Sequence, residues 1–201
     1  MASFSLLTPP ALADSAHWTV RKANMGDIGA LLELINGYAA KGIMLPRTEF
    51  EMSENIRDFT VAYLADESVC PTKLLGCGAL HFYSPTSAEV RSLAVDATSK
   101  TRGVGRRLVQ ALEEEALENN LHALFAFTYV PEFFRKVGFR EVERGELPLK
   151  VWKDCLRCPK FQCCDEIAVV KALRPDPVLD TGMEPEPALI QLPQLRNRAE
   201  T

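Results

Sequence analysis

The segment from residue 88 to residue 116 constrains the fold more than any other part of the sequence. Residues 88–95 (AEVRSLAV) have the composition of a β-strand. An amphipathic helix follows, with apolar residues at helical spacing at Val104, Leu108, Leu112 and Ala116. The strand and the helix are joined by a basic turn with two glycines, Lys100-Thr101-Arg102-Gly103-Val104-Gly105-Arg106.

This turn has the features of a pyrophosphate-binding site. The first turn of a helix carries free backbone N–H groups and a partial positive charge, and glycines let the backbone approach a phosphate closely. Lys100, Arg102 and Arg106 add formal positive charge. The competing interpretation is a solvated basic helix start. The turn is not a Walker loop, because the Gly-Lys-Ser/Thr ending is missing, and it lacks the third glycine of a dinucleotide fingerprint.

The remaining segments predict a mixed β-sheet covered by helices. Capping-box patterns begin two helices, at Asn24 with Asp27 and at Thr48 with Glu51, and Pro131 begins a short third one. Further strands are predicted at 17–23, 59–64, 74–83, 123–129, 139–143 and 166–172. Helices separated by a run of strands favour an α/β (α+β) fold with about six to seven strands in one sheet.

The chain is predicted to contain one folded domain, at residues 17–173, which includes a cysteine-rich block at 147–165. Residues 1–16 are expected to be a disordered leader. They lack a basic n-region, and Pro9-Pro10 interrupts their apolar stretch. Residues 174–201 are rich in proline and have no sustained apolar period, which is typical of a disordered tail.

Composition argues against several classes of partner. The net charge of -4 does not suggest nucleic acid binding. No apolar run approaches the ~20 residues that a membrane span needs. We therefore expect a cytoplasmic protein with no membrane partner. Its six cysteines are expected to stay reduced or to bind a metal rather than to form disulfides.

Two blocks of the sequence resemble the GNAT acetyltransferase superfamily. The strand EVRSLAVD, the turn KTRGVG and the helix RRLVQALEEEA are similar to its acetyl-CoA motif Arg/Gln-x-x-Gly-x-Gly/Ala, with Lys100 at the first position. Residues 133–139 (FFRKVGF) resemble its second motif, FYxxxGF. This resemblance implies the GNAT fold and acetyl-CoA as the acetyl donor. A homodimer is implied only by analogy.

A closer resemblance, over residues 19–172, is to short-form bacterial N-acetylglutamate synthases. It is carried by the segments LINGYA, GIMLPRT, ENIRDF, GALH and LPLKVWKDCLRCPKFQCCDE. It implies transfer of an acetyl group to the α-amine of L-glutamate, the first step of arginine biosynthesis, by direct attack in a ternary complex and with no metal required.

The resemblance also implies roles in binding and catalysis. In GNAT folds the strand before the turn splays from its neighbour, and its free amides bind the pantetheine arm and polarise the thioester. That role falls to Leu93, Ala94 and Val95. Glu89 stands where long-form synthases have a proposed general base. Its competing interpretation is an exposed carboxylate at a strand edge.

The acid that many GNAT enzymes use is missing from this sequence. A tyrosine there protonates the leaving thiolate, and this chain has Phe134 instead. Thr128 and Tyr129 are the candidates to replace it, although Tyr129 is equally consistent with an ordinary tyrosine at a strand end. His81 lies in an apolar strand and is interpreted as a core histidine rather than a base.

Four basic residues are candidates to bind substrate carboxylates. Arg47 follows the GIMLP segment and matches a substrate-binding arginine of the long forms. Arg91 comes two residues after Glu89, so the two side chains share one strand face. Lys150 and Lys160 are weaker candidates, and a surface position is the favoured interpretation for each.

A compact cluster of cysteines lies near the end of the predicted domain. Cys155, Cys158, Cys163 and Cys164 could bind zinc. No histidine lies nearby and the spacing is short for a zinc ribbon, so reduced thiols that pack a C-terminal turn are favoured.

Two other functions stay open. A different amine, such as glutamine, a polyamine or a protein N-terminus, could accept the acetyl group. Alternatively, a degenerate GNAT module could bind CoA or an amino acid as a sensor without turnover. The missing tyrosine motivates the sensor hypothesis, whereas the intact turn and Glu89 argue against it.

Overall fold

The computed structural model describes residues 18–64, 73–147, 158, 160 and 163–175. Within them, seven strands form one sheet in the order β1-β2-β3-β4-β5-β7-β6. All neighbours are antiparallel except β4 and β5, which are parallel. The predicted mixed sheet is therefore confirmed. The strands are β1 (Trp18–Lys22), β2 (Phe59–Leu64), β3 (Leu74–Phe82), β4 (Ser87–Val95), β5 (Ala123–Thr128), β6 (Arg140–Val142) and β7 (Ile167–Ala172).

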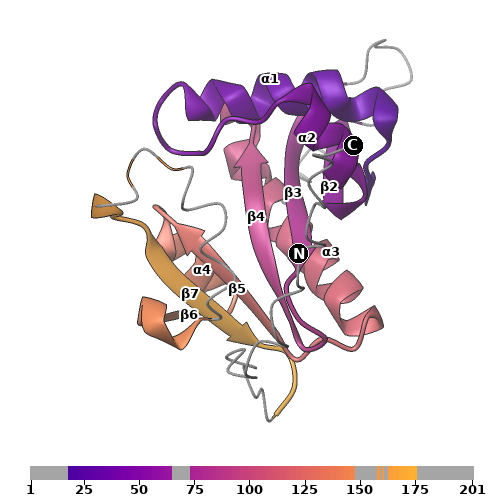
Figure 1. The fold of residues 1–201 in the computed structure, drawn as a ribbon. Coiled ribbons are helices and arrows are strands. Elements are labelled where there is room, and N and C mark those ends of the chain that lie inside the picture. Colours follow the sequence, from indigo (N-terminus) through magenta and orange to yellow (C-terminus); the bar gives the residue numbers. More distant parts are fainter. Residues whose placement is uncertain (1–17, 65–72, 148–157, 159, 161–162, 176–201) are drawn as a thin grey trace, which may run out of the picture.

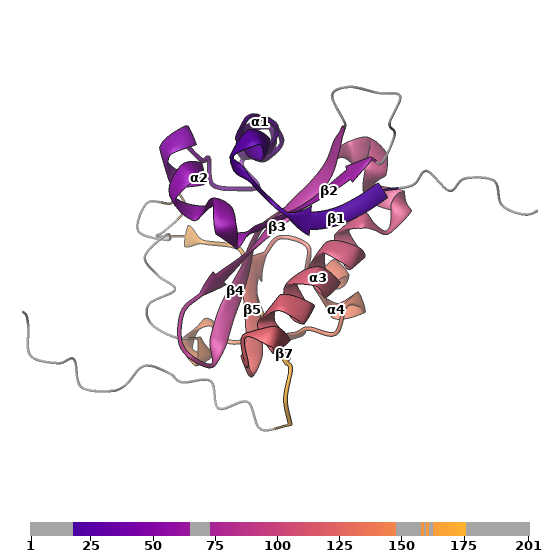
Figure 2. The same cartoon turned by 90° about the vertical axis from the view of Figure 1, so that its right-hand side faces the viewer.

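Helices cover both faces of this sheet. Figure 2 shows one pair of α-helices on one face and another pair on the other. The first pair is α1 (Ile28–Ala39) and α2 (Glu49–Asn55), and the second is α3 (Val104–Glu118) and α4 (Pro131–Lys136). Single 3-10 turns flank them at η1 (Met25–Asp27), η2 (Ile56–Asp58), η3 (Ala97–Arg102) and η4 (Arg144–Glu146).

The two faces bury separate hydrophobic clusters. Under α1 and α2 the cluster includes Leu31, Ile35 and Met52, each at most 1% exposed. Under α3 and α4 the cluster includes Leu112 and Leu124, which are fully buried. Burial of a leucine or isoleucine side chain stabilises the fold by about 1.5–3 kcal/mol, so both helix layers are held mainly by these contacts. No helix in the described part of the chain has the length and hydropathy to cross a membrane.

The capping signals of the sequence act as predicted. Asn24 and Asp27 form a reciprocal capping box, as do Thr48 and Glu51. Pro131 occupies the first turn of α4, where its missing N–H has no helical partner to lose. The sixth strand is shorter than the predicted 139–143, because only residues 140–142 pair with β7.

The central feature of the fold is the separation of β4 from β5. The parallel pairing covers only Ser87 to Glu89 of β4, opposite Ala123 to Phe125 of β5. Beyond Glu89, β4 continues along β3, while β5 remains paired with β7 to its last residue. Figure 1 shows the two strands diverging toward the end of β4 that lies beneath α1.

A β-bulge in β4 marks this point. The register with β3 shifts between Cys77 and Ala79, and Ser92, on β4 opposite that shift, has a positive φ of 52°. Because one extra residue reverses the alternation of side chains, Arg91 points toward the α1–α2 face and Leu93 packs toward the α3 face. The sequence did not predict the bulge.

Candidate active site

A cavity of about 860 Å³ lies where β4 and β5 separate. Its walls come from the end of α1 and the loop after it, the second half of β4, the start of α3, the end of β5 with α4, and residues just before β7. Most of the residues singled out in the sequence line it, although they come from distant segments. The lining includes Arg47, Glu89, Arg91, Leu93, Val95, Gly103, Gly105, Arg106, Thr128, Tyr129, Lys160, Cys158 and Cys164.

The basic turn forms one end of the cavity. Asp96 begins η3 by accepting the backbone N–H of Thr98 at 3.0 Å, and Gly103 then reverses the chain with a φ of 76°. A Cβ on Gly103 would meet nothing within 4 Å, so the backbone faces open space there. Gly103, Gly105 and Arg106 line the cavity. These features fit a pyrophosphate held by the start of α3.

Val104 has a different role from the neighbouring glycines. Its side chain is completely buried in the core, so it anchors the start of α3 and does not line the cavity. The side chains of Lys100, Thr101 and Arg102 lie outside the described part of the structure, and their roles remain predictions.

The exposed edge of β4 offers amides from only two of the three predicted residues. Asp96 donates its backbone N–H to the carbonyl of Leu75, on the β3 side. Because amides alternate along a strand, that of Ala94 also points to β3, whereas those of Leu93 and Val95 point to the open side. Ala94 is only 3% exposed. The N–H of Ala94 therefore faces β3 and not the open edge, and a role of Ala94 in acetyl-CoA binding stays a prediction.

Tyr38 fixes the end of this edge. Its hydroxyl donates a 2.6 Å hydrogen bond to the carbonyl of Val95, and its ring lines the cavity. This contact ties the last turn of α1 to the strand that precedes the basic turn. This role could not be predicted from the sequence, because a tyrosine in a helix gives no signal of a partner far along the chain.

Glu89 and Arg91 project into the cavity from one face of β4, as their spacing predicted. Arg91 Nη2 lies 3.5 Å from Asp58 Oδ2, an ion pair whose arginine is largely buried. The same carboxylate oxygen lies 2.7 Å from Nδ1 of His81. His81 has a hydrogen-bond partner, as expected of a satisfied histidine, but its side chain is half-buried and not enclosed in the core.

The loop after α1 carries Arg47 into the cavity. The side-chain amide of Asn36 accepts the backbone N–H of Arg47 at 2.9 Å and donates to its carbonyl at 3.0 Å. This double hydrogen bond fixes the backbone of Arg47 just before the capping box of α2. Gly42 makes the turn possible with a φ of 70°. The position of Arg47 is therefore set by α1.

Tyr129 and Lys160 meet at the opposite wall. Lys160 Nζ donates to the hydroxyl oxygen of Tyr129 at 3.1 Å and also forms an ion pair with Asp165 at 3.3 Å. Burial raises the pKa of Tyr129 even though Lys160 lowers it, so the phenol keeps its proton at neutral pH. The hydrogen bond to Tyr129 raises the pKa of Lys160. Lys160 is thus part of a cluster and not a free surface charge.

Thr128 and Phe134 both make contacts that support the structure around the cavity. The hydroxyl oxygen of Thr128 accepts the backbone N–H of Val130 at 2.9 Å, which shapes the turn into α4. Phe134 is 3% exposed and packs edge-to-face against Phe133 and Phe139. The position of the usual tyrosine is therefore a packing position in this chain.

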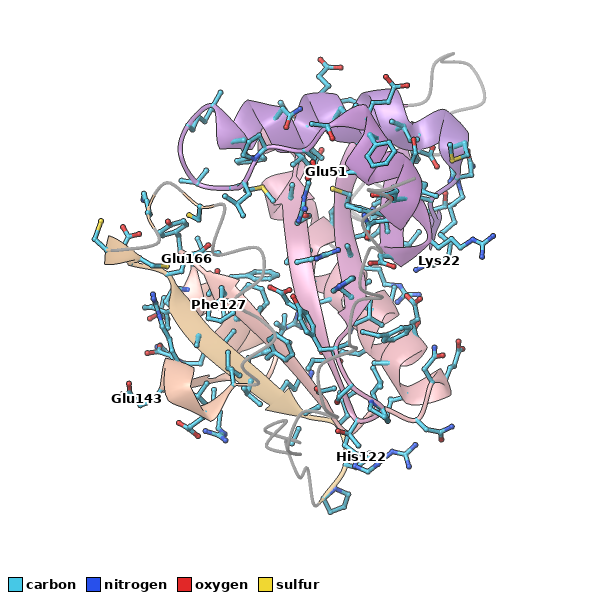
Figure 3. The ribbon with its side chains drawn as sticks, viewed as in Figure 1. Lys22, Glu51, His122, Phe127, Glu143 and Glu166 are labelled. Carbon is cyan, nitrogen blue, oxygen red and sulfur yellow. The ribbon has the colours of Figure 1, made fainter. Side chains whose placement is uncertain are left out.

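Arg144 and Glu166 are cavity residues that the sequence analysis did not identify. Arg144 donates to the backbone carbonyls of Cys164, at 3.0 Å, and of Glu166, which fixes the segment before β7. Burial raises the pKa of Glu166, and the charge of Arg144 opposes this shift. Figure 3 shows Glu166 beside β7 and close to Phe127, on the side of the sheet that diverges from β4.

The cysteines do not form a metal site among the described residues, where no three His, Cys, Asp or Glu side chains are grouped to hold an ion. Cys158 and Cys164 line the cavity as free thiols, and Cys163 is exposed. Cys155 and Lys150 lie outside the described residues, so their predicted roles stay predictions. His122 lies at the far end of the sheet (Figure 3).

The charged residues that line the cavity are mostly positive, whereas the net charge of the whole chain is negative. Among the residues that the structure describes, five cationic side chains line it, from Arg47, Arg91, Arg106, Arg144 and Lys160, against the carboxylates of Glu89 and Glu166. The chain as a whole carries a net charge of -4. A positively charged cavity in an acidic protein favours anionic ligands by attraction at short range.

Several known proteins are similar to this chain in sequence and fold. The profile of the acetyltransferase (GNAT) family matches residues 37–139. An uncharacterized N-acetyltransferase from Chlorobaculum tepidum is 40% identical over 79% of this chain and 99% of its own length. An amino-acid acetyltransferase from Mycobacterium tuberculosis is 33% identical over 69% of this chain and 77% of its own. N-acetylglutamate synthase from Neisseria gonorrhoeae, solved with coenzyme A and N-acetyl-glutamate, superimposes with a TM-score of 0.69 at 26% identity, over 81% of this chain and 36% of that one.

The sheet opens between β4 and β5, and a glycine-containing turn and α3 follow β4. This arrangement defines a class of CoA-dependent acyltransferases. The chain belongs to the acetyltransferase (GNAT) family, and it is an enzyme of the amino-acid acetyltransferase type that uses acetyl-CoA. The predicted family, fold and acetyl donor are thereby confirmed. The chain spans 36%, about a third, of the length of the gonococcal synthase. The activity of that whole protein therefore does not transfer directly to this chain.

Proposed function

We propose that the enzyme acetylates the α-amine of L-glutamate. The observation that carries this proposal is the excess of cationic side chains around the cavity, where Arg47 and Arg91 line the same space as Glu89. A dicarboxylic acceptor needs paired cations, and arginine binds a carboxylate with two parallel hydrogen bonds. The gonococcal synthase, solved with N-acetyl-glutamate, supports the same assignment, and the amino-acid acetyltransferase of Mycobacterium tuberculosis supports an amino acid as the acceptor.

The proposed mechanism uses residues that already line the cavity. The start of α3, with Gly103 and Arg106, would hold the pyrophosphate of acetyl-CoA, and the amides of Leu93 and Val95 would hold its pantetheine arm and polarise the thioester carbonyl. Glu89 would accept a proton from the acceptor ammonium, directly or through water. The neutral amine then attacks the carbonyl carbon.

The departure of the thiolate completes the proposed reaction. The usual acid is absent, and Tyr129 is the candidate to supply a proton, since it lines the cavity and its phenol is protonated at neutral pH. A thiol has a pKa of ~8.5, so a thiolate needs little assistance near neutral pH. We therefore infer that Tyr129 assists the departure and that turnover does not depend on it.

A panel of acceptors tests this function directly. Release of CoA thiol would be measured with acetyl-CoA and L-glutamate, L-glutamine, L-aspartate or spermidine. We expect kcat/KM for glutamate to exceed that for glutamine by roughly 10–100-fold, because one charged hydrogen bond is worth about 1.5–3 kcal/mol. A preference for glutamine or spermidine would contradict the glutamate assignment. Tight CoA binding without thiol release from any of the four would support the sensor hypothesis instead.

The cellular role follows from this substrate. If glutamate is the acceptor, the enzyme catalyses the first step of arginine biosynthesis, and we propose a cytoplasmic location for it. A homodimer also remains a proposal, supported only by analogy with other GNAT proteins. Analytical ultracentrifugation of the full chain would test the dimer.

A further inference from the structure

His81 and Asp58 form a hydrogen-bonded pair next to the cavity. The 2.7 Å contact joins Nδ1 of His81, in β3, to Oδ2 of Asp58, the last residue of η2. A carboxylate at one ring nitrogen fixes the orientation of an imidazole and leaves the other nitrogen to exchange protons. The pair thus has the form of a positioned proton acceptor.

This pair lies directly opposite Glu89 in the sheet. The β3–β4 ladder pairs the Cα atoms of His81 and Glu89. Opposite residues in such a ladder project from the same face, with Cβ atoms about 4.5–5.5 Å apart. Glu89 lines the cavity but His81 does not, and 32% of the His81 side chain is exposed. His81 therefore reaches solvent by a route outside the cavity.

We propose that His81, oriented by Asp58, takes the proton from Glu89 and releases it to solvent after each turnover. This proposal rests on the proposed function, with Glu89 as the base. The acceptor arrives as an ammonium and gives one proton to Glu89. The N–C bond forms and the C–S bond breaks, and the second amine proton ends on the thiol sulfur. One proton remains on Glu89, and it must leave before the next cycle.

The charges around His81 suit this role. Asp58 faces it from η2, Glu89 lies opposite it on β4, Arg91 of β4 contacts the same Asp58 carboxylate, and the ring of Tyr83, just after β3, packs edge-on at 5.1 Å. Two carboxylates, from Asp58 and Glu89, and one guanidinium, from Arg91, thus lie on the side of the imidazole that faces the sheet and η2. Bound substrates exclude water from the cavity, so an exit on its outer side is needed when the cavity is filled.

Chemical rescue tests the relay. In His81→Ala, turnover with glutamate in a low concentration of a bulky buffer should fall by about 10²-fold, the lower end for loss of a positioned proton-transfer group. Added imidazole should restore turnover in proportion to its concentration, which a purely structural defect would not do. The Michaelis constant for acetyl-CoA should stay unchanged. His122→Ala, altered at the far end of the sheet, is the matched control and should show neither the loss nor the rescue.

A second variant distinguishes a loss of proton transfer from a folding defect. His81→Gln keeps a hydrogen-bond donor for Asp58 but cannot carry the proton, so it should match the wild-type melting temperature and still lose turnover. Full activity of both His81 variants, or a loss that imidazole does not restore in either, would overturn the relay while leaving the proposed function intact. Absence of acetyl transfer by the wild-type enzyme would instead overturn the proposed function, and the relay with it.

Discussion

In the proposed mechanism, single residues of the cavity have separable roles, because the acceptor and the donor would contact different walls. Arg47 comes from the loop after α1, whereas Gly103 and Arg106 come from the start of α3. Glu89 lines the cavity from β4. A substitution on one wall should therefore change the kinetics of one substrate and leave those of the other nearly unchanged.

Arg47→Ala tests the acceptor wall. Loss of one charged hydrogen bond to a substrate carboxylate should raise the Michaelis constant for glutamate by roughly 10–100-fold and leave that for acetyl-CoA unchanged. Arg47→Lys should recover only part, because lysine lacks the planar fork. Arg140→Ala, on the exposed strand β6, is the control for a general charge effect. Unchanged glutamate kinetics together with a lower melting temperature would assign Arg47 to loop stability alone.

Glu89→Gln tests the proposed base. The amide cannot accept the ammonium proton, so turnover near pH 7 should fall by roughly 10²–10⁴-fold, while calorimetry should find nearly the wild-type affinity for acetyl-CoA. Glu118→Gln, at the exposed end of α3, provides a variant with the same chemical change outside the cavity. Turnover within a factor of a few of the wild type would remove Glu89 from catalysis.

At the level of elements, the site depends on how β4, η3 and α3 follow one another. The bulge at Ser92 turns Leu93 away from the face of Arg91, and the left-handed Gly103 turns the chain from η3 into α3. The last turn of α1 holds both walls, because Asn36 binds the backbone of Arg47 and Tyr38 binds Val95.

Gly103→Val tests the turn as a unit. A β-branched residue is strongly disfavoured at a φ of 76°, and its side chain would occupy the open space in front of the helix start. We expect the dissociation constant for acetyl-CoA, measured by calorimetry, to rise at least about tenfold, which is ~1.4 kcal/mol. Gly29→Ala, in α1 with no neighbour within 4 Å of the added methyl group, should bind acetyl-CoA normally. Normal binding by Gly103→Val would contradict the assignment of the phosphate site.

The elements were predicted better from the sequence than their mutual contacts. Capping boxes, Pro131 and the apolar period of α3 are local signals, and the structure confirms each of them. The bulge at Ser92, the partner of His81 and the roles of Arg144 and Glu166 depend on residues far apart in the chain. Ala94 shows the same limit, since only the register with β3 reveals which side its amide faces.

At the level of the whole molecule, polar contacts join the edge of the sheet to its helical cover. Arg21 of β1 forms an ion pair with Asp27 at 2.7 Å, just before α1, and its guanidinium lies 5.1 Å from the ring centre of Tyr63 on β2. Burial, reinforced by Asp27, raises the pKa of Tyr63 to about 12. On the other face, Lys171 of β7 pairs with Glu113 of α3. These contacts make stability depend on pH.

Asp27 gives that dependence a definite sign. Burial alone would raise its pKa, but hydrogen bonds from Arg21 and from the Asn24 amide outweigh this effect, and the pKa is lowered. A carboxyl group with a lowered pKa stabilises the fold fully above its unfolded pKa of ~3.9, and this contribution is lost as pH falls through the folded value. Asp27→Asn should therefore cost about 1–2 kcal/mol at pH 7, allowing for the screening of the exposed Arg21.

Thermal unfolding between pH 2 and pH 8 measures this contribution. At pH 7 the Asp27→Asn variant should melt roughly 2–8 °C below the wild type, and the gap should start to narrow below the unfolded pKa of ~3.9 and close once pH has fallen through the lowered pKa of the folded carboxyl group. Glu54→Gln, on the exposed side of α2, removes a carboxylate without a buried partner and should follow the wild-type curve throughout. A gap between Asp27→Asn and wild type that stays constant down to pH 2 would mean that Asp27 contributes through its shape and hydrogen bonds rather than through its charge.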